Sequence, residues 1–236
     1  AIIEGGVKIV ETAGRSPEKF MDALKSHGVK VIHKCTSVRH ALKAHKICCD
    51  AVSADCFECG GHPGEDDIPN YILLPRVAEE LSIPFVASGG IGTGSQLVAS
   101  LALGAEGINM GTRFLATKKA PVHDNVKQAI IDATELDTRL IMRNLTNTER
   151  VLKNKAVDEL VALEKERGAD ITFEEVAPFV VAKYKDIMQN GQMDEGAWSC
   201  GMVAGLIHDI PTCQELVDRL MSEANEIISK RLAGMQ

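Results

Sequence analysis

The stretch ASGGIGTGSQLVASLALGAEGINMGTRF, Ala87–Phe114, places two glycine-containing loops directly after two short apolar segments. The first loop, SGGIGTG (Ser88–Gly94), precedes a helix-like segment, and the second, NMGTRF (Asn109–Phe114), precedes a helical turn. Such glycines either make tight turns or let the backbone approach a ligand, with the helix N-terminus behind them attracting an anion. Two of these loops in succession favour the phosphate grip that follows strands seven and eight of a (β/α)8 barrel.

Outward from this stretch, short β-branched segments alternate with longer segments of helical period, which is the pattern of βα units and a parallel sheet. We expect five strands, at Val7–Thr12, Val29–Lys34, Asp50–Asp55, Ile83–Gly90 and Glu106–Gly111. Helices are expected between them at Ser16–Gly28, Ser37–Lys46, Ile72–Leu81 and Gly94–Leu103. If the glycine loops follow strands seven and eight, these are strands four to eight of a TIM barrel, and the first three strands are missing.

The character of the chain changes after Thr112. Helical periodicity predicts helices at Val122–Thr134, Val151–Arg167, Phe173–Gln189 and Cys213–Leu232, with a short strand at Thr138–Met142. A glycine-rich turn region, residues 190–205, lies between the last two helices. We therefore predict two parts that pack on each other. Residues 1–120 form the C-terminal part of the barrel with the phosphate loops, and residues 121–236 form a helical lid and closing helices.

Composition narrows the classes of protein. The 236 residues carry a net charge of −7, so a nucleic-acid backbone or an anionic membrane is not an expected partner. We find no apolar run long enough for a membrane span and no secretory leader, and we expect a cytoplasmic protein. Seven scattered cysteines indicate reduced thiols, and a structural zinc site would need a second paired motif beside Cys56 and Cys59. No metal is expected.

The loop CFECGGHPGEDD, Cys56–Asp67, follows the third expected strand, and active sites of such barrels lie on loops of this kind. Its paired glycines would bring His62 into the pocket, and imidazole is well matched to proton transfer near neutral pH. The acidic residues Glu65, Asp66 and Asp67 either orient this histidine or face water. A surface loop and a metal site are the alternatives. A further alternative is a catalytic thiol at Cys56 or Cys59, as in a relative of IMP dehydrogenase. The GGHPG motif weighs against this alternative.

Three motifs together resemble the nitronate monooxygenases, formerly called 2-nitropropane dioxygenases, a family related to the FMN-dependent enoyl-acyl carrier protein reductases. The motifs are GGHPGEDD, the stretch Ala87–Thr117, and GLIHDIP (Gly205–Pro211). The resemblance implies an FMN-binding TIM barrel with a helical lid, acting on a small nitronate or nitroalkane and oxygen. It implies His62 as the base that takes a proton from the carbon bearing the nitro group.

The same resemblance implies the residues that bind FMN. These are Gly60 and Gly61 beside the flavin, Gly89, Gly90 and Ile91 in the first phosphate loop, Gly111 and Thr112 in the second, and Lys34, which faces either the flavin or solvent. Met202 stands where the resemblance leads us to expect a glutamine. Because strands are missing, we expect a chain that folds marginally and binds flavin poorly on its own. Association into a homodimer is one way to complete the pocket.

Two other functions remain open. One is a flavin-dependent enoyl-thioester reductase that uses NAD(P)H, in which the same histidine would assist protonation of a carbanion. The other, of a different class, is an inactive fragment that retains binding of a phosphate ligand or a partner through its exposed strand edges.

Overall fold

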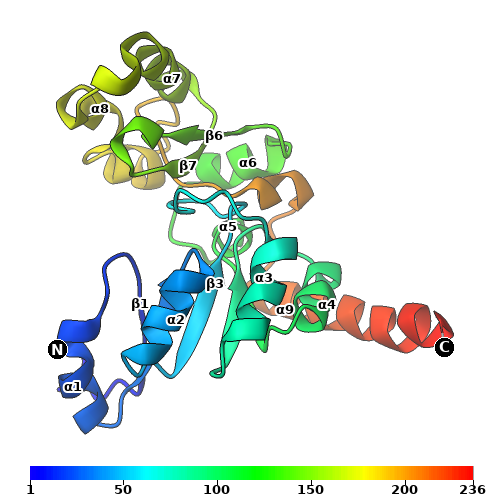
Figure 1. The fold of residues 1–236 in the computed structure, drawn as a ribbon. Coiled ribbons are helices and arrows are strands. Elements are labelled where there is room, and N and C mark those ends of the chain that lie inside the picture. The colour runs from blue at the N-terminus through cyan, green and yellow to red at the C-terminus, as the bar shows by residue number, and fades with distance from the viewer. Residues whose placement is uncertain (236) are drawn as a thin grey trace.

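A computed structural model describes residues 1–235 of the chain, and its first half is an α/β unit (Figure 1). Five parallel strands form one sheet in chain order: β1 (Ile9–Thr12), β2 (Lys30–Cys35), β3 (Ala51–Asp55), β4 (Phe85–Ser88) and β5 (Gly107–Asn109). The helices between them are α1 (Glu18–Ser26), α2 (Val38–Lys46), α3 (Asn70–Glu80) and α4 (Gly94–Ala102). The predicted parallel sheet and its connecting helices are therefore confirmed.

Side chains alternate between the two faces of this sheet, as the two-residue period of a strand requires. Val31, Val52 and Ala87 point to the helices and are fully buried in the main core, where they join Leu73 and Val77 of α3. The residues between them point to the opposite face. The sequence pattern thus separates an apolar face, which builds the core, from a face that carries polar groups near the ends of the strands.

The sheet curls until side chains of its two edge strands meet. Asn109 on β5 donates a hydrogen bond from Nδ2 to Oε1 of Glu11 on β1, at 2.9 Å. The same amide group lies 3.4 Å from the hydroxyl of Ser53 on the central strand β3. Three strands therefore contribute to one polar layer on the concave face. A flat sheet of this width could not bring residues of β1 and β5 into contact.

After β5 the chain builds a second layer above the ends of the strands (Figure 1). It contains α5 (Thr112–Leu115), α6 (Asp124–Asp132), the antiparallel hairpin β6 (Thr138–Ile141) and β7 (Glu149–Leu152), α7 (Lys155–Arg167) and α8 (Phe173–Val180). Short helical turns follow at Arg143–Leu145, Gly168–Asp170, Lys185–Gln189 and Met202–Leu206. The chain then returns to the sheet through α9 (Cys213–Glu226), which continues as wider turns over Ile227–Leu232.

Two helices predicted from the sequence have different bounds. The helix predicted at Val151–Arg167 begins only at Lys155, because Val151 and Leu152 belong to β7 and Asn154 caps the helix by accepting from the amide of Val157 at 2.8 Å. The helix predicted at Phe173–Gln189 ends at Val180.

The early end of α8 has a local cause. The carbonyl of Phe179 accepts from the amide of Ala197 instead of from the next helical turn, and Ala182 takes a left-handed conformation with φ of 60°.

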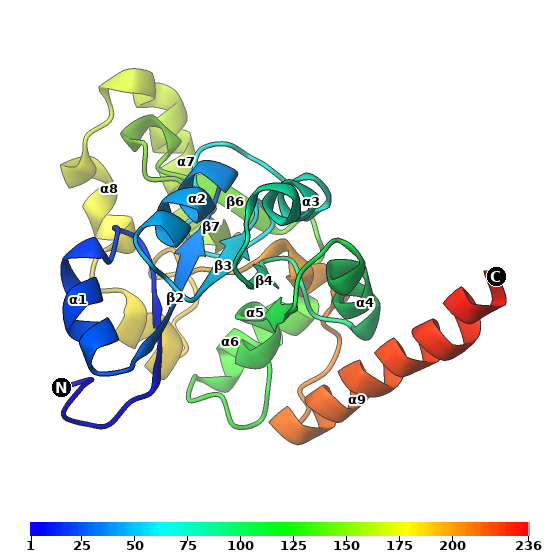
Figure 2. The same cartoon turned by 60° about the horizontal axis from the view of Figure 1, so that its bottom comes forward.

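Helix α9 packs along α4 and extends past it (Figure 2). The two helices come into contact at Gly94, where a Cβ atom would stand 2.5 Å from Cβ of Glu223 and 2.6 Å from the carbonyl oxygen of Leu220. The carboxylate of Glu223 accepts from the amide of Gly94 at 2.8 Å. A glycine at the start of α4 thus lets the last helix reach the loop that follows β4.

We expect Gly94→Ala to lower the free energy of unfolding by about 1–3 kcal/mol, because the added methyl group overpacks the α4–α9 contact. Helix propensity alone predicts the opposite sign, since alanine favours a helix over glycine by about 1 kcal/mol. Urea unfolding followed by circular dichroism measures the difference. Gly111→Ala is the matched control, since its Cβ would meet nothing within 4 Å. Equal stability of the two variants would contradict the close approach.

Candidate functional site

A cavity of about 300 Å³ opens where the strands end. Its lining contains seven of the residues that the sequence singled out: Lys34, Gly60, Gly89, Gly90, Ile91, Gly111 and Thr112. They come from the ends of β2, β3, β4 and β5, which parallel strands bring to one edge of the sheet. Gly61 and His62 do not line this cavity. We call it the glycine-lined cavity.

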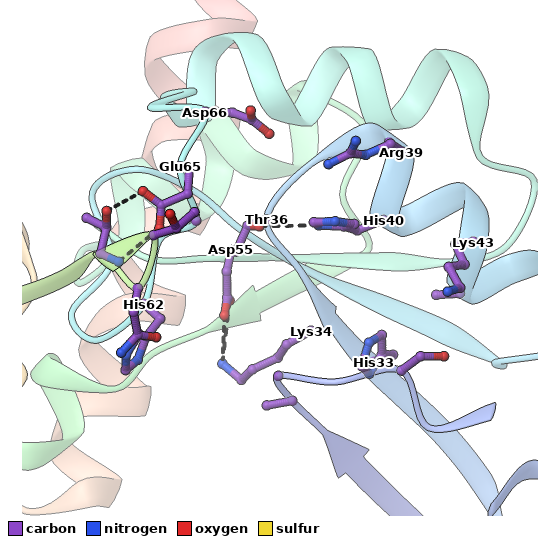
Figure 3. Close-up of a pocket in the computed structure, with 18 of the residues that line it drawn as sticks. His33, Lys34, Thr36, Arg39, His40, Lys43, Asp55, His62, Glu65 and Asp66 are labelled. Carbon is purple, nitrogen blue, oxygen red and sulfur yellow. Dashed lines mark hydrogen bonds and ion pairs between the residues drawn. The ribbon is translucent and has the colours of Figure 1, made fainter. Parts of the chain in front are cut away.

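His62 lines a second, larger cavity of about 690 Å³ (Figure 3). The two cavities share Lys34, Asp55 and Gly60, so they meet at the ends of β2 and β3. The imidazole of His62 is exposed and makes no hydrogen bond to any residue in the described part of the chain. It is therefore free to bind a ligand. We call this second space the histidine cavity.

Two positive φ angles shape the first glycine loop. Gly89 and Gly90 have φ of 85° and 71°, a region that residues with a Cβ atom rarely adopt. A Cβ atom at Gly89 would lie 2.5 Å from Cβ of Cys59, and one at Gly90 would lie 2.7 Å from Cβ of Glu58. The loop after β4 therefore packs directly on the loop after β3, and only glycine fits at these two positions.

The cysteines of the CxxC sequence serve this packing. Cys56 is 1% exposed and its thiol donates to the carbonyl of Gly89 at 3.4 Å. Burial raises the pKa of the Cys59 thiol to about 12 and raises that of Cys56 still further above its usual range. A neutral thiol is a poor nucleophile, so the structure does not support a catalytic cysteine here. No metal-binding cluster occurs among residues 1–235.

The first turn of α4 differs from the anion site that the sequence suggests. The side chain of Gln96 accepts from the amides of Gly92 and Thr93 at 2.8 and 3.2 Å, and Glu223 accepts from the amide of Gly94. These three donors are therefore used within the protein. The amides that stay free for a ligand therefore lie closer to the end of β4 than the sequence suggests.

Four backbone amides at the ends of β4 and β5 have no acceptor among residues 1–235. They belong to Gly90 and Ile91 in the first loop and to Thr112 and Arg113 in the second. The hydroxyl of Thr112 accepts from the amide of Gly201 at 2.9 Å, so its own proton is available to a ligand. Unpaired donors at the edge of a cavity are suited to a phosphate.

One cation reaches both cavities. Lys34, at the end of β2, lies 3.3 Å from the carboxylate of Asp55, which is only 8% exposed. The hydroxyl of Ser53 also reaches this carboxylate at 3.5 Å. Lys34 is thus held over the meeting point of the cavities by a nearly buried partner and not left to move freely in solvent.

The residue that holds the histidine loop was not predicted from the sequence. Arg150 on β7 is 4% exposed and donates from Nη2 to the carbonyl of Phe57 at 2.9 Å. Its guanidinium lies 4.5 Å from the centre of the Phe57 ring, and Nη1 donates to Thr138. The backbone of Arg150 also pairs with Gly61 in both directions, at 2.6 and 3.0 Å. The hairpin therefore fixes the residue next to His62.

The acidic residues of the loop do not orient His62. Glu65 accepts from the amide and the hydroxyl of Thr148, and Asp67 forms an ion pair with Arg143 at 2.7 Å. Both carboxylates attach the loop to the hairpin. Met202, where the family resemblance led us to expect a glutamine, donates its backbone amide to the carbonyl of Glu58 at 3.1 Å.

We expect Arg150→Lys to lower the free energy of unfolding by about 2 kcal/mol, because one ammonium group cannot replace the guanidinium bonds to both the carbonyl of Phe57 and the hydroxyl of Thr138. Arg143→Lys, which changes an exposed ion pair on the same loop, should change it by less than about 0.5 kcal/mol. Urea unfolding of both variants gives the comparison. If the exposed substitution cost as much as the buried one, the hairpin clamp would be wrong.

The chain belongs to the nitronate monooxygenase family, whose model matches residues 2–223. The family consists of flavin-dependent oxidoreductases and monooxygenases, so the chain is an enzyme of that class. A probable nitronate monooxygenase of Staphylococcus aureus (strain Newman) is 34% identical over 157 residues, which cover 63% of this chain and 44% of the relative.

Two further matches extend over more of the chain. A dehydrogenase of Rhodococcus jostii, named for (3aS,4S,5R,7aS)-5-hydroxy-7a-methyl-1-oxo-octahydro-1H-indene-4-carboxyl-CoA, is 29% identical and covers 94% of this chain and 72% of the relative. The structure of FabK from Thermotoga maritima superimposes with a TM-score of 0.91 at 31% identity, over all of this chain and 73% of FabK. In the part of the chain that the structure describes, no helix combines the length and hydropathy of a membrane span.

Proposed function

We propose that this chain oxidises alkyl nitronates with molecular oxygen as an FMN-dependent monooxygenase, with His62 as the base. The observation that carries the proposal is the free imidazole of His62 beside a cavity that continues into the glycine-lined cavity. The five strands then correspond to strands four to eight of a TIM barrel, with residues 1–120 binding FMN and residues 121–236 covering it.

The residues present fit FMN in two ways. A Cβ atom at Gly111 would meet nothing within 4 Å, so the backbone there borders open space that a ligand can fill. The amides of Gly90, Ile91 and Thr112 are unpaired donors on the same wall, as a phosphate requires. We therefore assign the phosphate to these loops and the ring system to the side near Gly60, with Lys34 at the meeting point of the cavities.

The chain's own contribution to the reaction is positioning and proton transfer. The flavin, when bound, supplies the redox chemistry that passes electrons to oxygen. His62 takes the proton from the carbon that bears the nitro group, and the imidazole then carries that proton as a cation. Because the pairing of Gly61 with Arg150 fixes the backbone beside His62, the imidazole has a limited range of positions over the cavity.

A second function on the same site is reduction of an enoyl thioester with NAD(P)H. It is favoured by one specific observation: the Rhodococcus jostii relative, which covers 94% of this chain, is named for a carboxyl-CoA compound. A carbon next to a thioester carbonyl undergoes proton transfer as a carbon next to a nitro group does, so His62 suits either substrate. Consumption of NAD(P)H with an enoyl thioester separates the two functions.

We expect His62→Gln to lower kcat/KM for propyl-2-nitronate by about a hundredfold or more, the usual contribution of general base catalysis. Oxygen consumption measures the rate, and the visible spectrum of bound flavin should stay unchanged because His62 does not line the glycine-lined cavity. His27→Gln, at an exposed histidine on another part of the surface, is the control. Full activity of the His62 variant would exclude this base.

We expect Gly111→Ala to weaken FMN binding by about tenfold or more without loss of stability, because the added methyl group enters the space proposed for the ligand. Titration of the apoprotein with FMN, followed by flavin fluorescence, gives the dissociation constant. Gly234→Ala is the matched control, since its Cβ also meets nothing but lies outside the cavity. If both variants bound FMN equally, the flavin would not occupy this wall.

A further inference from the structure

The histidine cavity extends well beyond His62, toward one face of α2 (Figure 3). The basic residues that line this end are Arg39, His40 and Lys43, with His33 of β2 beneath them. Figure 3 shows the three α2 side chains on the side of the cavity opposite the loop that carries His62. The cavity therefore joins the proposed base to a basic surface.

The charge of this region departs from that of the chain. The segment Thr36–Cys49 contains an arginine, two lysines and two histidines and no acidic residue, whereas the whole chain has a net charge of −7. Two of these residues, Arg39 and His40, lie in the first turn of α2, where the helix dipole disfavours cations. The stability of the helix therefore does not explain their presence.

The acidic residues of the cavity are largely used elsewhere. Asp55 pairs with Lys34, and Glu65 is hydrogen-bonded to Thr148. Arg39 and Lys43 make no ion pair with any residue in the described part of the chain, although Asp66 also lines the cavity. Two cations thus face this space without a fixed counter-charge.

The size of the cavity indicates what could fill it. Its volume of about 690 Å³ lies within the range of roughly 300–1,000 Å³ that is usual for ligands larger than a small nitroalkane. A substrate that reacts at His62 and extends to α2 must carry its anionic group at a distance from its reacting carbon. Phosphates on a flexible chain meet this requirement, and arginine and lysine are the side chains that bind them best.

We propose that Arg39, His40 and Lys43 bind the phosphate groups of a thioester substrate carried on phosphopantetheine, as in coenzyme A, while its acyl carbon lies at His62. The proposal rests on the second of the two functions given above. It adds to that function a binding site on α2 for the phosphate groups of the substrate, distinct from the phosphate loops proposed for FMN.

The test is calorimetric titration of the FMN-loaded protein with coenzyme A. We expect the double variant Arg39→Gln/Lys43→Gln to bind it about a hundredfold more weakly, or about tenfold for each charge removed. Lys46→Gln, on the same helix but outside the cavity, is the matched control and should bind as the wild type does. Equal affinity of the wild type and the double variant would overturn the proposal.

Two further probes identify the contact. Pantetheine, which lacks phosphate, should bind weakly to all variants, and affinity for coenzyme A should fall as sodium chloride is added. Pantetheine binding as tightly as coenzyme A would overturn the proposal. Holo acyl carrier protein is tested as well, in case it binds and coenzyme A does not. If the double variant then loses binding of the carrier protein, the phosphate of the carrier protein lies at α2. If the double variant still binds the carrier protein, the α2 site is overturned.

These measurements do not depend on turnover. If coenzyme A binds through Arg39 and Lys43 while no thioester is reduced, the α2 site stands and the second proposed function fails. If an enoyl thioester is reduced with unchanged kcat/KM in the double variant, that function stands and the α2 site fails. The single variants Arg39→Gln and Lys43→Gln provide the same comparison should the double variant not fold.

Discussion

The buried guanidinium of Arg150 determines where the loop that carries His62 lies. A charge that is 4% exposed must be surrounded by acceptors, because its transfer from water is otherwise too costly. The acceptors are the carbonyl of Phe57 and the hydroxyl of Thr138, and the Phe57 ring lies against the guanidinium. Moving the loop away from the hairpin would leave both the cation and the carbonyl unpaired. The position of His62 is therefore a consequence of a charge buried nearby, and the hairpin is part of the site.

A second constraint is steric and lies between the loops that follow β3 and β4. The loops after β3 and β4 touch at Gly89 and Cys59, where there is no room for a further carbon atom. This contact explains why a CxxC sequence and a paired glycine occur in neighbouring loops. Small buried thiols on one loop and glycines without a Cβ atom on the other let the two loops pack at close range. Chemistry that the sequence allows for Cys56 and Cys59 is thereby lost, since their burial keeps both thiols neutral. The contact between the loops after β3 and β4 and the attachment to the β6–β7 hairpin together fix the wall that the two cavities share.

The sequence predicts the sheet from local signals, and it predicts part of the candidate site through its glycine loops and through the family resemblance. Alternating strands and helices bring glycine loops to one edge, and seven of the predicted residues line one cavity there. The hairpin could not be predicted in this way. Arg150 comes just before the helix predicted at Val151–Arg167 and has no local pattern of its own, and its partner Phe57 lies 93 residues earlier in the chain. Asn154, a good helix cap, was the local sign that the helix starts later. At the start of α4 the signal is mixed: Gln96, which takes the amides of Gly92 and Thr93, lies in the same turn, whereas Glu223, which takes the amide of Gly94, comes from the last helix.

The two proposed substrates differ in the part that would lie far from His62, at the end of the histidine cavity beside α2. A nitro group and a thioester carbonyl both acidify the neighbouring carbon, so one imidazole serves either, and the geometry around His62 cannot select between them. Selection must come from contacts that one substrate makes and the other lacks. A small nitronate ends near His62, whereas a thioester on phosphopantetheine continues past it. The basic face of α2 is rigid, because a hydrogen bond from the amide of His40 to Ser37 caps the helix and Ala41 and Ala44 are buried beneath it. Binding of phosphate there needs little ordering of the backbone, although the exposed side chains of Arg39 and Lys43 must still be ordered. In this proposal, discrimination between the substrates rests on the helix, while the loop supplies the chemistry common to both.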